Sequence, residues 1–363
     1  MRKSVVILLS INLFFSSVYS QDSYEEDDFI KNESFTKVSL EKIFETDKAV
    51  LGWGDLRFVS ISNDDQYLGM FFIDPLVKTF KYKLFKIDNN SLEEIDLKGD
   101  LSPIESMDCS IGFSKDSKQF YTLTTNMEVY IWSVETGNLL KKVKGRDRKE
   151  MKSPYAFVKN GQFQYDEISD QVISNGFIVF GDYLYLFNGL ISSGFSESAE
   201  KIKLKTSPTR IDFSKDNKFI GIVGLFSKEL DIYDVEKGKL ISSINSIKKP
   251  INSIQFIPQD NRIVMSEKFN MSISDFNSQD AKELFSLDKR CYTMDVNKRG
   301  LLAYAESPSY TTKVWDLKQS KLLFETPSLF KNITYELRLS NDGKYLYAVS
   351  ARGKVVCWKI SYI

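Results

Sequence analysis

Histidine is missing from all 363 residues of this chain. A Ser-His-Asp or Cys-His catalytic arrangement and a His-ligated zinc site are therefore excluded, as is the side chain that most often acts as a base near neutral pH. Any catalysis would depend on carboxylates, Lys, Tyr, Ser or an added cofactor. No acidic run has the alternating spacing of a calcium loop. We therefore expect no metal and no cofactor, and the sequence names no catalytic residue.

Cysteine is scarce, with only Cys109, Cys291 and Cys357. Three scattered cysteines are too few for a disulfide framework, even in an exported protein. The one bridge worth considering joins Cys291 to Cys357, which fall in neighbouring repeats of the pattern described below. The alternative is that these cysteines are buried free thiols.

An excess of either charge is also missing, because 49 Lys and Arg balance 49 Asp and Glu. This balance argues against nucleic acid as the main partner, since phosphate binding depends on a basic field. Aromatic residues make up 13% of the chain, whereas Gly and Pro are few, which excludes disorder over most of its length.

Only one apolar run stands out, from Val5 to Phe15, after the basic Arg2 and Lys3 and before the small Ser20. It is shorter than the ~20 residues that a spanning helix needs. We therefore predict a signal peptide over residues 1–20 that is removed on export. We expect residues 21–33 to form an acidic, flexible leader and residues 34–363 to form the folded domain. The mature protein is expected in the periplasm or outside the cell.

The folded region repeats one phrase: an apolar residue, Ser, any residue, Asp, a turn, and then an aromatic residue. The phrase is clearest from Ser340 to Tyr345. Counting degenerate copies, its Ser position recurs seven times at intervals of 40 to 55 residues, at Ser62, Ser114, Lys159, Ser214, Ile257, Asn297 and Ser340. Such a period is typical of stacked small β-sheets, because one sheet cannot bury its own apolar face.

A second landmark follows in most repeats: an alternating strand that ends in an aromatic residue and a polar one. The pairs are Trp132-Ser133, Tyr233-Asp234, Trp315-Asp316 and Trp358-Lys359. Period-two alternation predicts that these rings fill the gap between adjacent sheets. A turn with Gly137 or Gly238 then leads to an outer strand, which makes four strands in each repeat.

Together these residues resemble the WD-repeat propellers, in which a Trp-Asp dipeptide closes the third strand of each blade. The resemblance implies an all-β, seven-bladed propeller of four-stranded antiparallel blades. This chain differs from the family in one respect: it has no counterpart of the family's Gly-His dipeptide or of its His-containing tetrad. The last repeat ends in its third strand, Val355 to Ile360. We expect the segment from Phe35 to Leu40 to supply the missing outer strand and to close the ring.

The resemblance also implies a rim that gathers the loops between second and third strands and the segments leading into each blade. Loops of the first kind carry exposed aromatic residues and Arg, the residue types that dominate binding hot spots: Phe226, Phe269, Tyr310 and Arg352. The segment leading into the third repeat is basic and includes Arg146, Arg148 and Lys149, and Lys248-Lys249 and Lys289-Arg290 lead into later repeats. If these segments converge, they would attract an anionic ligand or an acidic protein surface. Alternatively, the rings fold back onto their own blades and the charges only aid solubility.

The function predicted from these features is a non-enzymatic, monomeric propeller that binds a protein partner or another ligand through one rim. The alternative is a carbohydrate hydrolase or lyase that uses carboxylates at the mouth of the central channel. Acids such as Asp55, Asp108 and Asp212 begin strands near the axis, but no catalytic pair can be named from the sequence.

Overall fold

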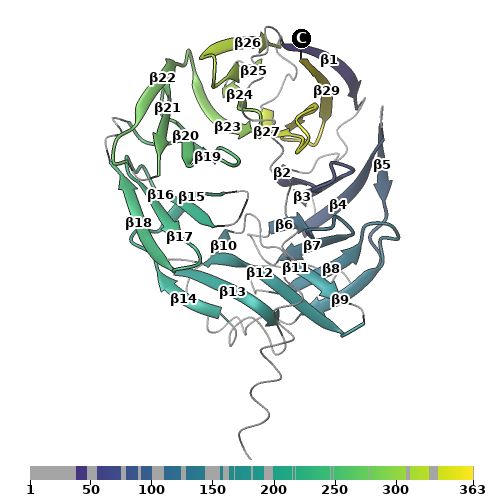
Figure 1. Ribbon diagram of the computed structural model, residues 1–363. Coiled ribbons are helices and arrows are strands. Elements are labelled where there is room, and N and C mark those ends of the chain that lie inside the picture. Colours follow the sequence, from purple (N-terminus) through teal and green to yellow (C-terminus); the bar gives the residue numbers. More distant parts are fainter. Residues whose placement is uncertain are drawn as a thin grey trace, which may run out of the picture. The chain divides into compact units, whose positions relative to one another are not determined.

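Short antiparallel strands joined by tight turns form the described part of the chain, in which no helix occurs (Figure 1). The computed structural model describes residues 38–46, 55–74, 79–88, 91–99, 110–123, 128–143, 156–157, 163–166, 168–180, 183–191, 199–214, 216, 218–245, 247, 249–276, 278–307, 311–326 and 334–362. Residues 37–363 belong to one compact unit. The predicted signal peptide and acidic leader lie outside the described residues.

Six sheets have four strands each, and each sheet is a blade of a propeller. The first four-stranded blade in chain order consists of β2 (Asp55–Ile61), β3 (Tyr67–Asp74), β4 (Thr79–Asp88) and β5 (Ser91–Ile95). The second consists of β6 (Ser110–Phe113), β7 (Gln119–Leu123), β8 (Val129–Ser133) and β9 (Leu139–Val143). The third consists of β15 (Pro208–Phe213), β16 (Phe219–Gly224), β17 (Leu230–Asp234) and β18 (Lys239–Ile244).

The next two blades are β19 (Ser253–Phe256), β20 (Arg262–Ser266), β21 (Asn270–Asp275) and β22 (Lys282–Ser286); and β23 (Arg290–Val296), β24 (Leu301–Ser307), β25 (Thr311–Asp316) and β26 (Lys321–Glu325). The closing blade has the order β1 (Val38–Glu45), β29 (Val355–Tyr362), β28 (Tyr345–Ser350) and β27 (Thr334–Leu339).

The prediction of seven four-stranded blades is wrong in its count, because that blade occurs six times in the described residues. The third repeat forms a five-stranded sheet of β10 (Ala156–Phe157), β11 (Phe163–Asp166), β12 (Gln171–Phe180), β13 (Tyr183–Ile191) and β14 (Ala199–Lys203). The long strand β12 pairs with both β10 and β11 on one edge. The sequence of this repeat has Lys159 at the Ser position, which lies outside the described residues.

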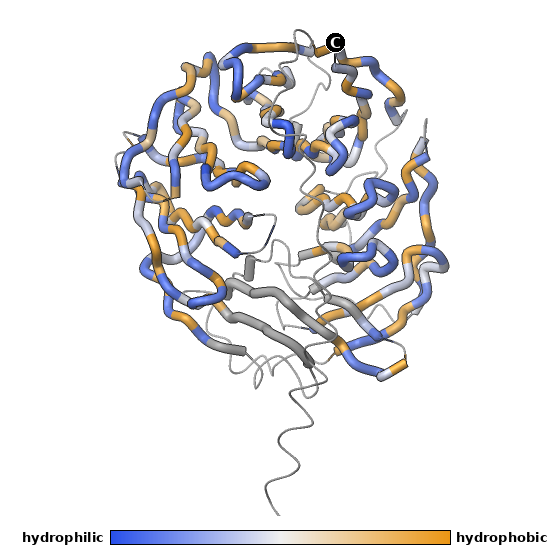
Figure 2. The backbone as a smooth tube through the Cα atoms, in the orientation of Figure 1, coloured by the Kyte–Doolittle hydropathy of each residue, from blue (hydrophilic) through white to orange (hydrophobic). Residues whose placement is uncertain are grey.

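The hydrophobic core is divided into layers that lie between neighbouring sheets. One layer joins Phe71 and Tyr82 of the first blade to Phe120 and Trp132 of the second. Comparable layers join the β10–β14 sheet to the β15–β18 blade, as Leu184 of β13 with Tyr233 of β17 shows, and each pair of sheets from there to the closing and first blades. Figure 2 shows hydrophobic stretches throughout the strands that it colours. The predicted role of the strand-ending rings is confirmed, because Trp132, Tyr233 and Trp358 are buried between sheets and Trp315 stacks on Phe285.

The repeated Ser-x-Asp phrase forms the same hairpin in four blades. In the closing blade, Ser340 Oγ donates to Asp342 Oδ1 at 2.7 Å and accepts the Tyr345 N–H at 2.8 Å. The turns that begin at Ser62, Ser114 and Ser214 repeat these bonds. The hairpin needs a residue in the left-handed region three positions after Ser, and Gly343 has φ 73° there.

The predicted closure of the ring by the N-terminal segment is confirmed, because β1 pairs antiparallel with β29. The register runs from Val38 opposite Tyr362 to Glu45 opposite Val356, with a bulge near Phe44. The strand therefore extends to Glu45, five residues beyond the segment that the sequence suggested. The added strand pairs with the edge of the last blade and ties the beginning of the domain to its end.

Within the described part of the chain, no helix has the length and apolar character that a bilayer crossing requires.

Candidate binding site on the loop rim

The loops between second and third strands lie beside the segments that lead into the next blade. The Ile251 N–H donates to the Ser227 carbonyl at 3.0 Å, and the Leu287 N–H donates to the Phe269 carbonyl at 2.6 Å. At the closing blade, the Leu56 N–H donates to the Ala351 carbonyl at 2.8 Å. The two kinds of segment predicted to share one rim therefore share it at these three places. This face is called the loop rim below.

A pocket of about 410 Å³ opens on the loop rim between the β19–β22 and β23–β26 blades. The residues that line it come from the loop after β20, the segment leading into β23, β23 itself and the end of β24: Phe269, Asp288, Lys289, Arg290, Tyr292 and Ser307. Two of them are aromatic residues that are about half exposed, with Phe269 at 45% and Tyr292 at 46%. The pocket therefore combines accessible apolar rings with ionic groups.

Tyr292 lies at a β-bulge of β23. Cys291 pairs with Glu306 and Thr293 pairs with Ala305, so Tyr292 has no residue opposite it on β24. Cys291 points into the core, while Arg290 and Tyr292 on either side of it face solvent. Arg290 Nη1 donates to Tyr292 Oη at 3.2 Å, which holds the two exposed side chains together. Bulges are frequent where a strand has to redirect a side chain next to a functional site.

The acidic side chain that lines the pocket forms an ion pair, whereas the basic side chains that line it form none with the residues that the structure describes. Asp288 Oδ2 lies 3.5 Å from Lys313 Nζ, which also lies 3.2 Å from the buried carboxylate of Glu306. Burial would lower the pKa of Lys313, but Glu306 and other nearby carboxylates raise it overall, so this ammonium stays charged. By contrast, Lys289 and Arg290 form no ion pair within the described residues. The lining therefore has an excess of positive charge, although the Asp288 carboxylate is also accessible.

The residues predicted for the site are only partly brought together. Phe269 lines the pocket beside Lys289 and Arg290. Phe226 and Arg352 are exposed on loops of other blades and do not line it. Tyr310, Arg146, Arg148 and Lys149 lie outside the described residues. The alternative that Phe226 and Phe269 fold back onto their blades is wrong, because both rings are exposed.

Asp288, Tyr292 and Ser307 were not among the predicted residues. Asp288 precedes the predicted Lys289-Arg290 pair, so proximity in sequence could have indicated it. Period-two alternation places Tyr292 on the face opposite the buried Cys291, so its exposure could have been predicted, but its position in a pocket between two blades could not. The position of Ser307 in the pocket depends on where β24 ends beside β23. That end is set by the pairing between the two strands, which the sequence does not show.

Acidic side chains on the innermost strands have a different role from the one considered for a hydrolase. Asp212 Oδ2 accepts the Phe256 N–H of the next blade at 2.8 Å, and Asp295 Oδ2 accepts the Leu339 N–H of the next blade at 2.7 Å. Burial would lower the pKa of Arg338, but Glu336, Asp295 and Asp212 raise it overall, so these groups interact across blades. The two aspartates therefore couple adjacent inner strands. Asp108 and the side chain of Asp55 lie outside the described residues, and the hydrolase alternative stays a prediction.

Cys291 and Cys357 are both buried free thiols, so the Cys291–Cys357 bridge that we considered does not form. Cys109 lies outside the described residues. Among the residues that the structure describes, no group of three or more Cys, Asp or Glu side chains is arranged to hold a metal ion.

The chain matches no protein-family model, and no curated protein matches it. The role of the pocket is therefore inferred from its own side chains.

Proposed function

We propose that this protein is an exported, non-enzymatic propeller that binds an acidic protein partner through the pocket between the β19–β22 and β23–β26 blades. The observation that carries the proposal is the presence of Phe269 and Tyr292 beside Lys289 and Arg290 in one open pocket. Aromatic residues and Arg are enriched in binding hot spots, where rings supply contact area and Arg supplies directional hydrogen bonds. Export is proposed on the pattern of residues 1–20 alone.

The structure of the ring also favours binding. The two blades that form the pocket are fixed by a shared apolar layer, so this part of the loop rim is formed before a partner arrives. A rigid surface loses little conformational entropy on association, which leaves more of the contact energy for affinity. The uncompensated basic groups would speed encounter with an acidic surface and make that encounter sensitive to salt.

We also propose that the blades are divergent WD repeats. The Ser-x-Asp hairpin and the strand-ending ring, which packs against the preceding sheet, support this relationship. Rigidity that histidine supplies in that family comes here from interdigitated apolar layers and from the aspartates that join inner strands.

The test is affinity capture from the envelope fraction of the host, followed by mass spectrometry. A variant with Phe269→Ala and Arg290→Gln should lose the captured partner, since truncation of one hot-spot residue costs at least about 2 kcal/mol, or roughly thirtyfold in affinity. The control is Lys298→Gln, because Lys298 is an exposed basic residue on the opposite face of the same blade. The proposal fails if the pocket variant and the control retain the same partner equally.

A further inference from the structure

Two large apolar side chains project from the turn between β16 and β17. Leu225 is 70% exposed and Phe226 is 80% exposed. Phe226 has φ 53°, a conformation that suits glycine and that a bulky side chain seldom adopts. The Ser227 N–H donates to the Gly224 carbonyl at 3.1 Å, which closes a four-residue turn with Leu225 and Phe226 at its tip.

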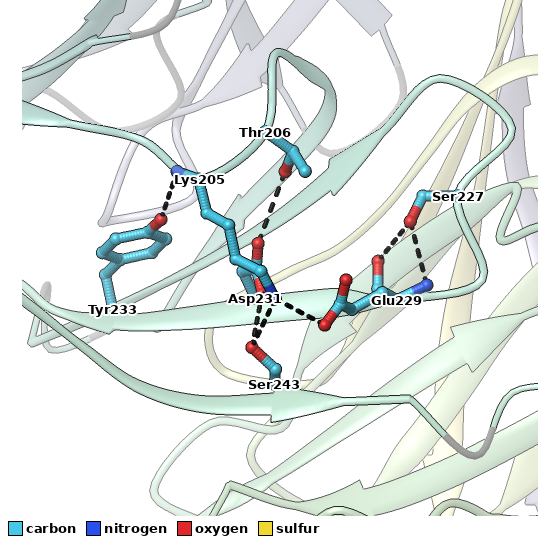
Figure 3. A network of polar contacts seen from close by, with 7 residues as sticks. All are labelled: Lys205, Thr206, Ser227, Glu229, Asp231, Tyr233 and Ser243. Atoms are coloured by element: carbon cyan, nitrogen blue, oxygen red, sulfur yellow. Dashed lines mark hydrogen bonds and ion pairs between the residues drawn. The ribbon is translucent and has the colours of Figure 1, made fainter.

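A polar network fixes this tip from below (Figure 3). Ser227 Oγ accepts the Glu229 N–H at 2.9 Å and donates to the Glu229 carbonyl at 3.0 Å. Lys205 Nζ bonds to Glu229 Oε1 at 2.6 Å and lies 3.4 Å from Asp231. Asp231 also accepts the hydroxyls of Ser243 and Thr206. Ser227, the last residue of the turn, therefore belongs to a network of hydrogen-bonded polar groups, and this network holds the apolar tip in position.

Around the tip, the basic side chains are exposed and the acidic side chains point inward. Lys228 follows the turn, Lys249 lies two residues before Ile251, which bonds to Ser227, and Lys268 lies on the next loop of the rim; all three are exposed. None of these lysines forms an ion pair within the described part of the chain. The neighbouring acids point inward: Glu229 and Asp231 bond to Lys205, and the buried Glu267 accepts the Ser272 hydroxyl at 2.8 Å. The surface around the tip is thus apolar at its centre and cationic around it.

We propose that the Leu225–Phe226 turn is an interfacial anchor that inserts into the headgroup region of an anionic lipid bilayer. The two apolar side chains enter the boundary with the acyl chains, while Lys228, Lys249 and Lys268 contact lipid phosphates. Peripheral membrane proteins use both kinds of contact, because the free energy gained by burying apolar area adds to that of electrostatic attraction to anionic lipids.

A bilayer suits this surface better than a protein cavity does. The tip is a convex projection of two adjacent side chains, and a fluid lipid surface accommodates such a shape without a matching pocket. The cations are spread over two blades, which fits a plane of phosphates. The inference does not depend on the proposed function, because Leu225 and Phe226 do not line the pocket that contains Phe269.

The experiment is co-sedimentation of the full protein with vesicles of phosphatidylglycerol and phosphatidylcholine in equal parts, compared with vesicles of phosphatidylcholine alone. The test variants are Leu225→Ser and Phe226→Gly. Phe226→Gly is the sharper one, because glycine suits the positive φ and the variant should fold at least as stably as the parent. The control is Ile168→Ser, since Ile168 is 98% exposed but lies beside Asp166 and Asp170.

We expect the parent to bind the anionic vesicles, and each test variant to weaken this binding by about tenfold or more. Ile168→Ser should bind like the parent, and raised salt should weaken binding for all of them. The proposal is overturned if the parent does not sediment with anionic vesicles, if neutral vesicles bind it equally well, or if Phe226→Gly binds as strongly as the parent.

Discussion

The carboxylate of Asp65 accepts the backbone N–H of Asn341 at 2.9 Å, although the two residues are 276 positions apart in the sequence. The same carboxylate accepts the Asp342 N–H at 3.1 Å, and the Asn341 side-chain amide reaches the carbonyls of Ser62 and Asn63. These bonds join the hairpin of the closing blade to that of the first blade, on the face opposite the loop rim. Closure of the ring therefore has a polar clasp in addition to the pairing of β1 with β29.

Replacing Asn341 by Ala should lower the free energy of unfolding by about 1 to 2 kcal/mol. The hydrogen bonds of its side-chain amide to the carbonyls of Ser62 and Asn63 are lost, while the Ser62 carbonyl stays partly buried. Lys115 occupies the same place in the hairpin of the β6–β9 blade and is exposed, so Lys115→Ala is the matched control and should change little. Urea unfolding followed by fluorescence measures both variants. Equal stability of Asn341→Ala and the parent would show that the clasp does not contribute.

Gly137 should not tolerate a side chain. It has φ 68°, and a Cβ atom there would lie 2.0 Å from the Asp96 carbonyl oxygen. Gly137→Ala should destabilise the protein by more than about 1 kcal/mol, the cost of the positive φ alone, because backbone also has to move. Gly224 has no positive φ and its nearest Cβ contact would be 3.5 Å, so Gly224→Ala should stay close to the parent. Comparable melting temperatures of the two variants would refute the steric account.

Asp342, in the hairpin of the closing blade, should make the fold sensitive to acid. Burial raises the pKa of Asp342, but the Ser340 hydroxyl and Lys344 outweigh it and hold the pKa below the model-peptide value of 3.8. Because the folded pKa is the lower one, the unfolded chain binds more protons in acid. This contribution is therefore present above the unfolded pKa and is lost as the pH falls through the folded one.

Asp342→Asn should accordingly be less stable than the parent at neutral pH, by about 1 kcal/mol for the weakened turn bonds. The gap between the two proteins should close as the pH falls. Melting temperatures measured from neutral to acidic pH test this. A gap that stays constant over that range would mean that Asp342 does not titrate with folding.

Buried thiols should be unreactive in the folded protein. Burial raises the pKa of Cys291 to about 12 and that of Cys357 to about 12, so the reactive thiolate is rare at neutral pH. Iodoacetamide should leave both residues unmodified until denaturant is added, as read by peptide mass spectrometry. Rapid labelling of either thiol in native buffer would contradict their burial between sheets.

The sequence was sufficient to predict those parts of the fold that one repeat determines. The hairpin at Ser340 and the buried positions of Trp132 and Tyr233 follow from local hydrogen bonding and period-two alternation. The clasp between Asn341 and Asp65 was not predicted, because it depends on how far one hairpin stands from the next. The β10–β14 sheet was not predicted for a related reason: without a Ser-x-Asp turn, nothing local indicates that two short strands share β12.

The candidate site was harder to predict than the blades. Phe269 and the Lys289-Arg290 pair were identified because hot-spot residue types on turns can be read directly. Alternation from the buried Cys291 places Tyr292 on the exposed face of β23, but only the packing of two blades shows that it joins Phe269 and the Lys289-Arg290 pair in one pocket. Phe226 was selected for the right residue type, but it belongs to a separate feature of the rim, since the loop that carries it lies on another blade.

The most direct test of the closed ring is a pair of cysteines across its seam. Ser39 lies opposite Ser361 in the register of β1 with β29. Mild oxidation of the Ser39→Cys and Ser361→Cys double variant should form one disulfide between the two introduced thiols, because the pairing of β1 with β29 brings these positions side by side. A folded double variant that forms no such disulfide would contradict closure by the N-terminal strand.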